Sequence, residues 1–286
     1  MPTPTVSLLL LCHNRDGYLE QAIASVLAQT YTDFELLIWD DGSTDRSLEI
    51  AQTFAQRDRR IRIIAAPHQD GAIARVRQQA IAQTQGEYLG WLDDDDCLLP
   101  TALEQTVAVL NRQPAVGMVY TDHQIIDEAG YVRGEGKRCH LPYSRDRLLV
   151  DFLTFHFRLM RRAIYEQVGG INPAYAYAYD YDLCLRLSEV TEVHHLAQPL
   201  YHYRQHPYSR SATRQLQRVL WSRRAVHEAL VRRGLGDRLS LSVGLGLRSN
   251  NELYSEFSLY AREPELTLDS DSWSDSGSRV NSGSPA

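Results

Sequence analysis

The chain has 286 residues, of which 43% are hydrophobic and 23% charged, and its formal net charge at neutral pH is −6. This length and apolar content suffice for one large core, and the acidic balance argues against nucleic acid as the main partner. No apolar run approaches the roughly 18 residues of a membrane span, and we expect no signal peptide because no charged segment precedes the first apolar run. Four scattered cysteines indicate reduced thiols in a cytoplasmic protein.

Short β-type runs alternate with helix-type stretches in the first part of the chain. The β-type runs are Val6–Cys12, Phe34–Trp39, Ile61–Ala65, Tyr88–Leu92 and Val116–Tyr120. The stretches with helical spacing of apolar residues are Tyr18–Gln29, Thr44–Gln56, Ile73–Gln83 and Thr101–Asn111. This alternation predicts βαβ units and an α/β fold with a mostly parallel central sheet and flanking helices.

Polar clusters follow three of the predicted strands. His13, Asn14 and Arg15 come after the first strand, and the pair Asp40–Asp41 comes after the second. The run Asp93–Asp96 follows the fourth. Ligands of parallel sheets bind outside the carboxyl ends of the strands, so we expect these clusters to meet in one site.

The four consecutive aspartates of Asp93–Asp96 repel one another and need a counter-charge. Carboxylate oxygens suit Mg²⁺ or Mn²⁺, and Mg²⁺ is often held by one or two carboxylates together with substrate phosphates. An isolated run of this kind would more simply be a solvated loop that caps the helix beginning near Pro100. The second acidic cluster at Asp40–Asp41 favours metal-assisted chemistry on a phosphate-bearing substrate.

The C-terminal part differs in composition. We expect a catalytic domain over residues 1–211, an arginine-rich helical segment over 212–248, and an acidic, Ser-rich and largely disordered tail over 249–286. Apolar residues from Leu216 to Leu230 recur at helical spacing in the second segment. This pattern indicates an amphipathic helix that either packs on the catalytic domain or contacts an anionic membrane surface or a diphosphate-linked acceptor.

The N-terminal region resembles the family 2 glycosyltransferases of the GT-A fold, over roughly residues 5–211. Three spaced motifs carry the resemblance, and weaker matches follow them. The three motifs are Asn14–Arg15 with the helix ending at Ser25–Tyr31, then Phe34–Asp45, and then Gly86–Asp96. The weaker matches are Gly169–Gly170, Tyr179–Leu187 and Tyr203–His206. The resemblance implies inverting transfer of a sugar from a nucleotide-diphosphate donor, with UDP-sugar favoured over dTDP-sugar, to a saccharide or lipid-linked acceptor.

The resemblance also implies roles for the acidic residues. Asp95 would bind a divalent metal, Mn²⁺ or Mg²⁺, on the donor diphosphate, while Asp93 and Asp94 would contact the nucleotide sugar. Asp40 and Asp41 match the position that recognises the nucleobase. Asp41 could instead form an Asx turn or cap the helix ahead of the next strand.

Basic and aromatic positions of the family motif are partly changed here. His13 stands where the family often has a tyrosine that stacks on the base, and Asn14 and Arg15 follow it in the donor site. Arg77 falls on an Arg-Asn pair whose arginine contacts base or diphosphate, but Gln78 replaces the asparagine. Arg77 could otherwise be a solvated helix residue.

Asp180 is the candidate general base, although Tyr179 replaces the first member of the family's acidic pair. Asp182 competes for this role if the register slips by two residues, and helix capping is the structural alternative for Asp180. His206 matches a histidine that reaches the metal or the diphosphate, and it could otherwise be a packing residue.

Two rival functions remain on the sequence alone. A sugar-1-phosphate nucleotidyltransferase would also need carboxylates and Mg²⁺, but it usually carries a Gly-rich loop with Arg and Lys where this chain has Cys12–Gly17. A non-catalytic, degenerate sugar-nucleotide-binding module is favoured by the changes at His13, Gln78 and Tyr179. The sequence predicts no oligomeric state.

Overall fold

The computed structural model describes residues 3–207, 214–247 and 253–261. Four strands at the N-terminal side of the central sheet pair in parallel, in the spatial order β3-β2-β1-β4. These strands are β1 (Val6–Cys12), β2 (Phe34–Asp41), β3 (Ile61–Ala66) and β4 (Tyr88–Asp93). The predicted βαβ arrangement is therefore confirmed for this part of the chain.

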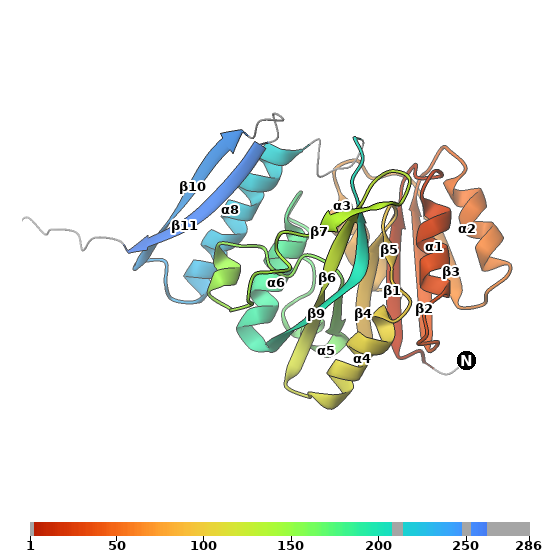
Figure 1. Ribbon diagram of the computed structural model, residues 1–286, viewed down its shortest axis with the longest axis horizontal. Helices are drawn as coiled ribbons and strands as arrows, with labels where there is room; N and C mark the ends of the chain where they lie inside the picture. Colours follow the sequence, from red (N-terminus) through yellow and green to blue (C-terminus); the bar gives the residue numbers. More distant parts are fainter. Residues whose placement is uncertain (1–2, 208–213, 248–252, 262–286) are drawn as a thin grey trace, which may run out of the picture.

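Helices cover both faces of the sheet, as Figure 1 shows. On β1, Leu8 and Leu10 pack into one core with α1 and α4, whereas Leu9 and Leu11 pack into a second core with α3 and α6. Because alternate residues of a strand point to opposite faces, a continuous apolar run supplies both cores. The helices of this region are α1 (Leu19–Leu27), α2 (Ser47–Ala55), α3 (Ile73–Ile81) and α4 (Ala102–Arg112).

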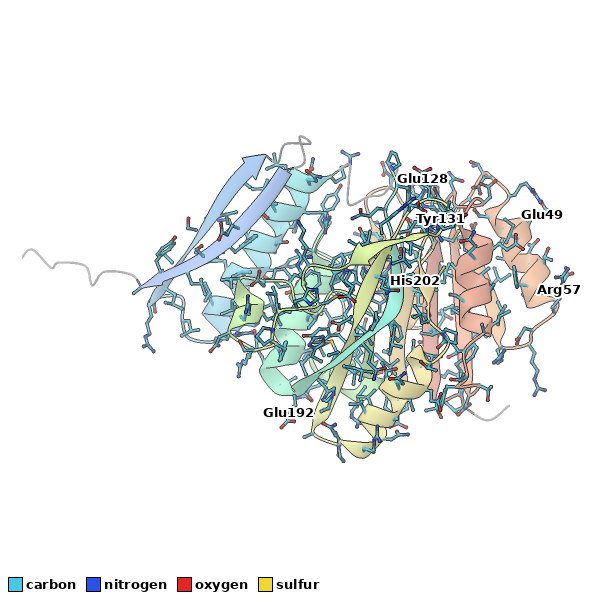
Figure 2. The ribbon with its side chains drawn as sticks, in the orientation of Figure 1. Glu49, Arg57, Glu128, Tyr131, Glu192 and His202 are labelled. Carbon is cyan, nitrogen blue, oxygen red and sulfur yellow. The ribbon has the colours of Figure 1, made fainter. Side chains whose placement is uncertain are left out.

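Beyond β4 the sheet becomes mixed. The strand β8 pairs antiparallel with both β4 and β6, and β6 pairs in parallel with β9. Figure 2 shows Glu128 and Tyr131, in the turn after β6, at the opposite end of the sheet from Glu192, the first residue of β9. The additional strands are β5 (Cys97–Leu98), β6 (Val116–Ile126), β7 (Val132–Glu135), β8 (Arg158–Arg161) and β9 (Glu192–Arg204).

The segment after β9 contains a helix and a β-hairpin. Helix α8 (Gln215–Arg232) packs on α6 (Tyr179–Val190) through a third core, which includes Tyr181, Leu185, Val226 and Leu230. Two short helices, η1 (Arg147–Leu149) and α5 (Arg162–Gln167), lie earlier in the chain. None of the described helices has the length and hydropathy needed to cross a membrane.

The hairpin was not predicted. Strands β10 (Leu239–Leu247) and β11 (Leu253–Ala261) pair antiparallel, so strand structure replaces part of the predicted helical segment and part of the predicted disordered tail. Leu241 and Phe257 pack against the third core. The two glycines in β10 weaken the strand signal, which explains the omission. Residues 262–286 of the predicted tail lie outside the described residues.

Candidate active site

Polar residues from three parallel strands meet at one edge of the sheet. The register pairs Cys12, at the end of β1, with Asp40 of β2, and pairs Leu11 with Asp93 of β4. The loops that follow these strands begin side by side. The three polar clusters singled out in the sequence are therefore neighbours in space.

Hydrogen bonds join the loop after β1 to the loop after β2. Asn14 has a left-handed backbone with a φ of 52°, and its side-chain oxygen accepts a hydrogen bond from the N–H of Thr44 at 2.8 Å. The N–H groups of Asn14 and Arg15 donate to the hydroxyls of Ser43 and Ser47 at 3.1 and 2.8 Å. The visible role of Asn14 is thus to orient this loop.

Asp41 holds two histidines together. His68 Nδ1 lies 2.7 Å from Asp41 Oδ2, and His13 Nδ1 lies 2.7 Å from the backbone carbonyl of Asp41. The two imidazole rings stack with their centroids 4.0 Å apart. The N–H of Gln69 donates to the other carboxylate oxygen at 3.2 Å, so Asp41 also anchors the loop after β3.

Asp40 and Asp45 occupy different positions in the loop after β2. Asp40 is buried, and its Oδ2 accepts a hydrogen bond from the N–H of Ser43 at 3.1 Å. Asp45 accepts from the N–H of Ser47, the first residue of α2, at 2.9 Å. Asp45 rather than Asp41 therefore accepts the hydrogen bond from the backbone N–H at the start of this helix.

Asp93, the last residue of β4, forms an ion pair with Arg77 of α3. Arg77 Nη2 donates to Asp93 Oδ1 at 3.0 Å, and the guanidinium lies over the rings of Trp91 and Tyr179. Burial raises the pKa of Asp93, but the nearby positive charges, chiefly that of Arg77, together with the Arg77 hydrogen bond lower that pKa to about 2. Arg77 is only 4% exposed, so the alternative of a solvated helix residue is wrong.

Asp94 and Asp95 share one arginine. Arg15 Nε lies 3.6 Å from Asp94 Oδ1 and 3.7 Å from Asp95 Oδ2. Asp95 Oδ2 also lies 2.9 Å from Nε2 of His206, which follows β9 and is buried. The other ring nitrogen of His206 has no hydrogen-bond partner within the part of the chain that the structure describes.

Asp96 has a structural role. The hydroxyl of Tyr201 donates to its Oδ2 at 2.6 Å, and the N–H of Arg204 donates to its Oδ1 at 2.7 Å. Burial, together with the neighbouring carboxylates, raises the pKa of Asp96 well above its usual value. The buried Arg204 guanidinium donates to the carbonyl of Asp95 at 2.7 Å and to two carbonyls in the turn after β6. These bonds hold the acidic run against β9.

Asp180 lies in the first turn of α6, next to a buried arginine. Arg158 of β8 is 3% exposed, and its Nη2 lies 3.4 Å from Asp180 Oδ2. Asp182 is 1% exposed and forms an ion pair with Arg186 at 2.6 Å. Of these two aspartates, Asp180 is the one that lines the cavity between the sheet and α6.

The cavity has a volume of about 190 Å³ and brings the charged groups together. Its charged lining includes Arg15, Arg77, Asp93–Asp96 and Asp180. Much of the remaining wall is aromatic and consists of Phe152, Phe155, His156, Tyr177, Tyr179, Tyr181 and Tyr203. Carboxylates thus face a mostly aromatic space, while His13, Asp40 and Asp41 lie outside its lining.

Within the described part of the chain, three groups of side chains could supply metal ligands. Among the described side chains, His13, Asp41 and His68 bring three potential ligand atoms within 4.8 Å, and so do Asp93, Asp96 and His156. In the latter group both oxygens of Asp96 already accept hydrogen bonds. Asp95 and His206 form the third place, with an oxygen and a nitrogen 2.9 Å apart. The 2.9 Å separation is that of a hydrogen bond, and it is also close to the roughly 3 Å between adjacent octahedral ligands about 2.1 Å from an ion, so the pair could hold a divalent cation without rearrangement.

Sequence reasoning missed three residues of the site. His68 lies in the loop after β3, and His156 and Arg158 flank the start of β8. Burial lowers the pKa of His156 well below its usual value, although the negative charge of Asp93 opposes this shift. An arginine inside the apolar run from Phe157 to Met160 was the one signal available, because a charge at such a position needs a partner.

Comparison with known proteins agrees with this geometry. The sequence profile of "Glycosyl transferase family 2" matches residues 7–169. The chain belongs to this family.

Two curated relatives illustrate the similarity. The chain is 35% identical over 206 residues to the O-antigen biosynthesis protein RfbC of Myxococcus xanthus, a match that covers 71% of this chain and 16% of that protein. It is 32% identical over 193 residues to the chondroitin synthase of Pasteurella multocida, covering 68% of this chain and 20% of that protein. The chain therefore spans at most about a fifth of the length of these relatives.

Solved structures share the fold. S. aureus TarS 1–349 in complex with UDP superimposes with a TM-score of 0.65 at 15% identity, covering 79% of this chain and 65% of that one. The mannosyltransferase PcManGT from Pyrobaculum calidifontis, in complex with GDP-Man and Mn²⁺, gives a TM-score of 0.60 at 16% identity, with coverages of 80% and 65%. The fold is that of the GT-A glycosyltransferases.

Proposed function

We propose that the chain is an inverting glycosyltransferase that moves a sugar from a nucleotide-diphosphate donor to a hydroxyl of a saccharide or lipid-linked acceptor. The observation that carries the proposal is that Asp93, Asp94, Asp95 and Asp180 line one cavity at the carboxyl edge of the sheet. In this proposal the carboxylates of the Asp93–Asp95 run serve the donor and its cation, and the carboxylate of Asp180 accepts a proton.

Asp180 is the proposed general base. It accepts the proton of the acceptor hydroxyl while that oxygen bonds to the anomeric carbon, and the bond from this carbon to the donor diphosphate breaks on the opposite face. The electron pair leaves with the nucleoside diphosphate. Asp180 is proposed in preference to Asp182 because Asp182 is 1% exposed, is paired with Arg186 and lies outside the cavity lining.

Asp95 and His206 are the proposed ligands of Mn²⁺ or Mg²⁺, with Asp94 close to the bound diphosphate. A bound cation would neutralise the charge that develops on the leaving diphosphate. Arg15 lies within 4 Å of both aspartates and adds a fixed positive charge at the same place. Asp93, held by Arg77, is proposed to contact the ribose.

The nucleobase is proposed to bind beside the stacked His13–His68 pair. Imidazole rings offer a flat surface, and the nearby Asp40 and Asp41 carboxylates suit an imide N–H donor, as in uracil or thymine. UDP-sugar is therefore the first proposed donor and dTDP-sugar the second.

Titration of UDP, dTDP and GDP into the purified chain, with Mn²⁺ and with a chelator, tests this function. Binding of one nucleotide that requires metal would support the proposal and identify the base. If none of the nucleotides binds in either condition, the site is not that of a nucleotide-sugar transferase, and a non-catalytic role takes its place.

A peripheral membrane location at the cytoplasmic face is proposed from the outer side of α8. Leu216, Leu220 and Val231 on this helix are 49%, 57% and 60% exposed, and the exposed Arg223 and Arg224 lie on the same helix. Apolar side chains flanked by arginines match the boundary of an anionic bilayer.

Flotation with vesicles tests the membrane contact. Vesicles that contain phosphatidylglycerol should retain the protein at low salt and release it at high salt, whereas pure phosphatidylcholine vesicles should not retain it. Exchange of both Leu216 and Leu220 for serine should weaken retention. Equal flotation of the wild-type chain and this variant would reject the proposed surface.

A further inference from the structure

His156 lines the cavity that holds both acidic parts of the proposed site. Asp93 and Asp180 line the same cavity, and one ring nitrogen of His156 lies within 4.8 Å of a carboxylate oxygen of Asp93. Two residues further along the chain, Arg158 contacts Asp180. In the proposed reaction the transferred sugar lies between the donor diphosphate and the base. His156 therefore borders the space that this sugar occupies.

Aromatic neighbours hold the imidazole of His156 in place. The ring stacks on Tyr201 with centroids 4.6 Å apart and an interplanar angle of 4°, and Phe155 meets it edge-on at 4.4 Å. His156 is only 7% exposed. These contacts fix the plane of the ring, so its two nitrogens point in set directions before a ligand binds.

The ring nitrogens of His156 are available to a ligand. The one hydrogen bond of this residue within the described part of the chain involves its backbone carbonyl, which accepts from the Thr121 hydroxyl at 3.4 Å. Burial, opposed by the charge of Asp93, lowers the pKa of the imidazole and favours the neutral ring. A neutral imidazole has one N–H donor and one acceptor, and a sugar hydroxyl can bond to either of them.

A cation fits this position less well than a sugar. Asp93, Asp96 and His156 bring three potential ligand atoms within 4.8 Å of one another. Both oxygens of Asp96, however, already accept hydrogen bonds, and Oδ1 of Asp93 accepts from Arg77. A metal ion here would have to displace these bonds, whereas a sugar hydroxyl needs only the nitrogen of His156.

The charges around His156 are balanced in pairs. Arg77 is paired with Asp93 at 3.0 Å, and Arg158 contacts Asp180 at 3.4 Å. A carboxylate on the sugar would add a charge beside two carboxylates whose arginines are already engaged, and an unpaired charge away from water is costly. The surroundings of His156 therefore suit an uncharged sugar.

We propose that a ring nitrogen of His156 hydrogen-bonds a hydroxyl of the donor sugar and selects an uncharged hexose or N-acetylhexosamine for transfer. This inference rests on the proposed function and names the class of sugar that is moved. His156 contacts the donor away from the reacting atoms, so it is a specificity residue.

Calorimetry with the full chain and Mn²⁺ tests the inference. The probes are UDP, UDP-glucose, UDP-galactose, their two N-acetylhexosamine counterparts and UDP-glucuronate. One of the uncharged UDP-sugars should bind more tightly than UDP-glucuronate. His156→Phe keeps a ring against Tyr201 and removes both nitrogens. This variant should retain the wild-type affinity for UDP and lose about 3- to 10-fold in affinity for the preferred UDP-sugar.

Two further variants separate recognition from packing. His123→Phe is the matched control, because His123 packs beside Phe155 in the same aromatic cluster but lies outside the cavity lining, and it should change neither affinity. His156→Gln restores a hydrogen-bonding group and should recover part of the loss. A deoxy analogue that lacks the contacted hydroxyl should bind more weakly to the wild-type chain and no more weakly to His156→Phe.

Three results would overturn the inference. They are unchanged affinity for the UDP-sugar in both His156 variants, tightest binding of UDP-glucuronate, and an equal loss of UDP and UDP-sugar affinity in both variants, which would show a structural role. Failure of the wild-type chain to bind UDP would instead refute the proposed transferase function itself.

Discussion

Arg158 and Asp180 are joined across the cavity wall by a 3.4 Å contact between a buried strand residue and the first turn of a helix. Nη1 of the same arginine donates to the carbonyl of Thr154 at 3.1 Å, and its guanidinium lies over Trp91. The contact fixes the direction in which the Asp180 carboxylate points. It also supplies a permanent positive charge beside the proposed base.

Removal of the base should stop transfer and leave donor binding intact. Asp180→Asn keeps the size and polarity of the side chain but cannot accept the proton, so kcat should fall roughly 10²–10⁴-fold. Calorimetry with UDP and Mn²⁺ should give the wild-type affinity. Transfer at a near-normal rate would assign the base to another group.

Substitution of Arg158 should lower the rate of transfer through its effect on the position of Asp180. Arg158→Lys retains the charge but loses the planar contact with the carboxylate, so kcat should fall about 10- to 100-fold with little change in donor affinity. The same change should cost little further in an Asp180→Asn background, because the two residues act as a unit. Additive losses in the double variant would contradict a positioning role.

Change of either proposed ligand should weaken metal-dependent nucleotide binding. Asp95→Asn and His206→Gln should each lower the apparent Mn²⁺ affinity by about 10- to 100-fold, measured by calorimetry at fixed UDP. His202→Gln is a matched control, because this histidine lies on β9 next to Gln124 and outside the cavity lining. If nucleotide binding in both ligand variants depends on Mn²⁺ as it does in the wild-type chain, other residues bind the cation.

The buried His123 should make stability depend on pH. Burial, and then the charge of Arg138, lowers the pKa of His123 to about 4, below the 6.5 of the free side chain. Between these values the unfolded chain binds more protons than the folded one, so stability present above pH 6.5 is lost as pH falls toward 4. This residue should account for about 2–3 kcal/mol of that loss.

Urea unfolding at pH 7 and pH 4.5 measures this effect. The His123→Phe variant keeps an aromatic ring beside Phe155 and Tyr203 and has no proton to bind. Its stability should therefore decrease less between the two pH values than that of the wild-type chain. The same decrease in both proteins would show that carboxylates alone cause it.

The parallel half of the fold could be predicted because its strands are buried on both faces. Val6–Cys12 and Phe34–Trp39 are apolar except for Ser7 and Glu35, and each run is followed by polar residues, as expected at the end of a strand. That Asp40 and Asp93 lie at the same edge of the sheet follows from topology, since parallel neighbours end at the same edge.

Contacts made over long sequence separations could not be predicted in the same way. The carboxylate of Asp96 is bound by Tyr201 and Arg204, although Asp96 lines the same cavity as Asp93–Asp95, and no local pattern in the sequence distinguishes it from them. The partner of Asp180 comes from β8, a strand of four residues with little periodicity. The hairpin β10–β11 packs against the core that α8 shares with α6. The alternation of leucine with serine in β10 is a strand signal, but two glycines interrupt it, so the sequence alone assigns no element to this run.

Asp95 and His206 are 111 residues apart in the chain and belong to loops after β4 and β9. A cation held by both would therefore cross-link the first half of the sheet to its last strand. Binding of such an ion to the folded chain alone raises the melting temperature with ion concentration. If this pair holds the cation as proposed, the thermal stability of the protein would depend on the concentration of the divalent ion, and a chelator would lower the melting temperature as well as the transfer activity.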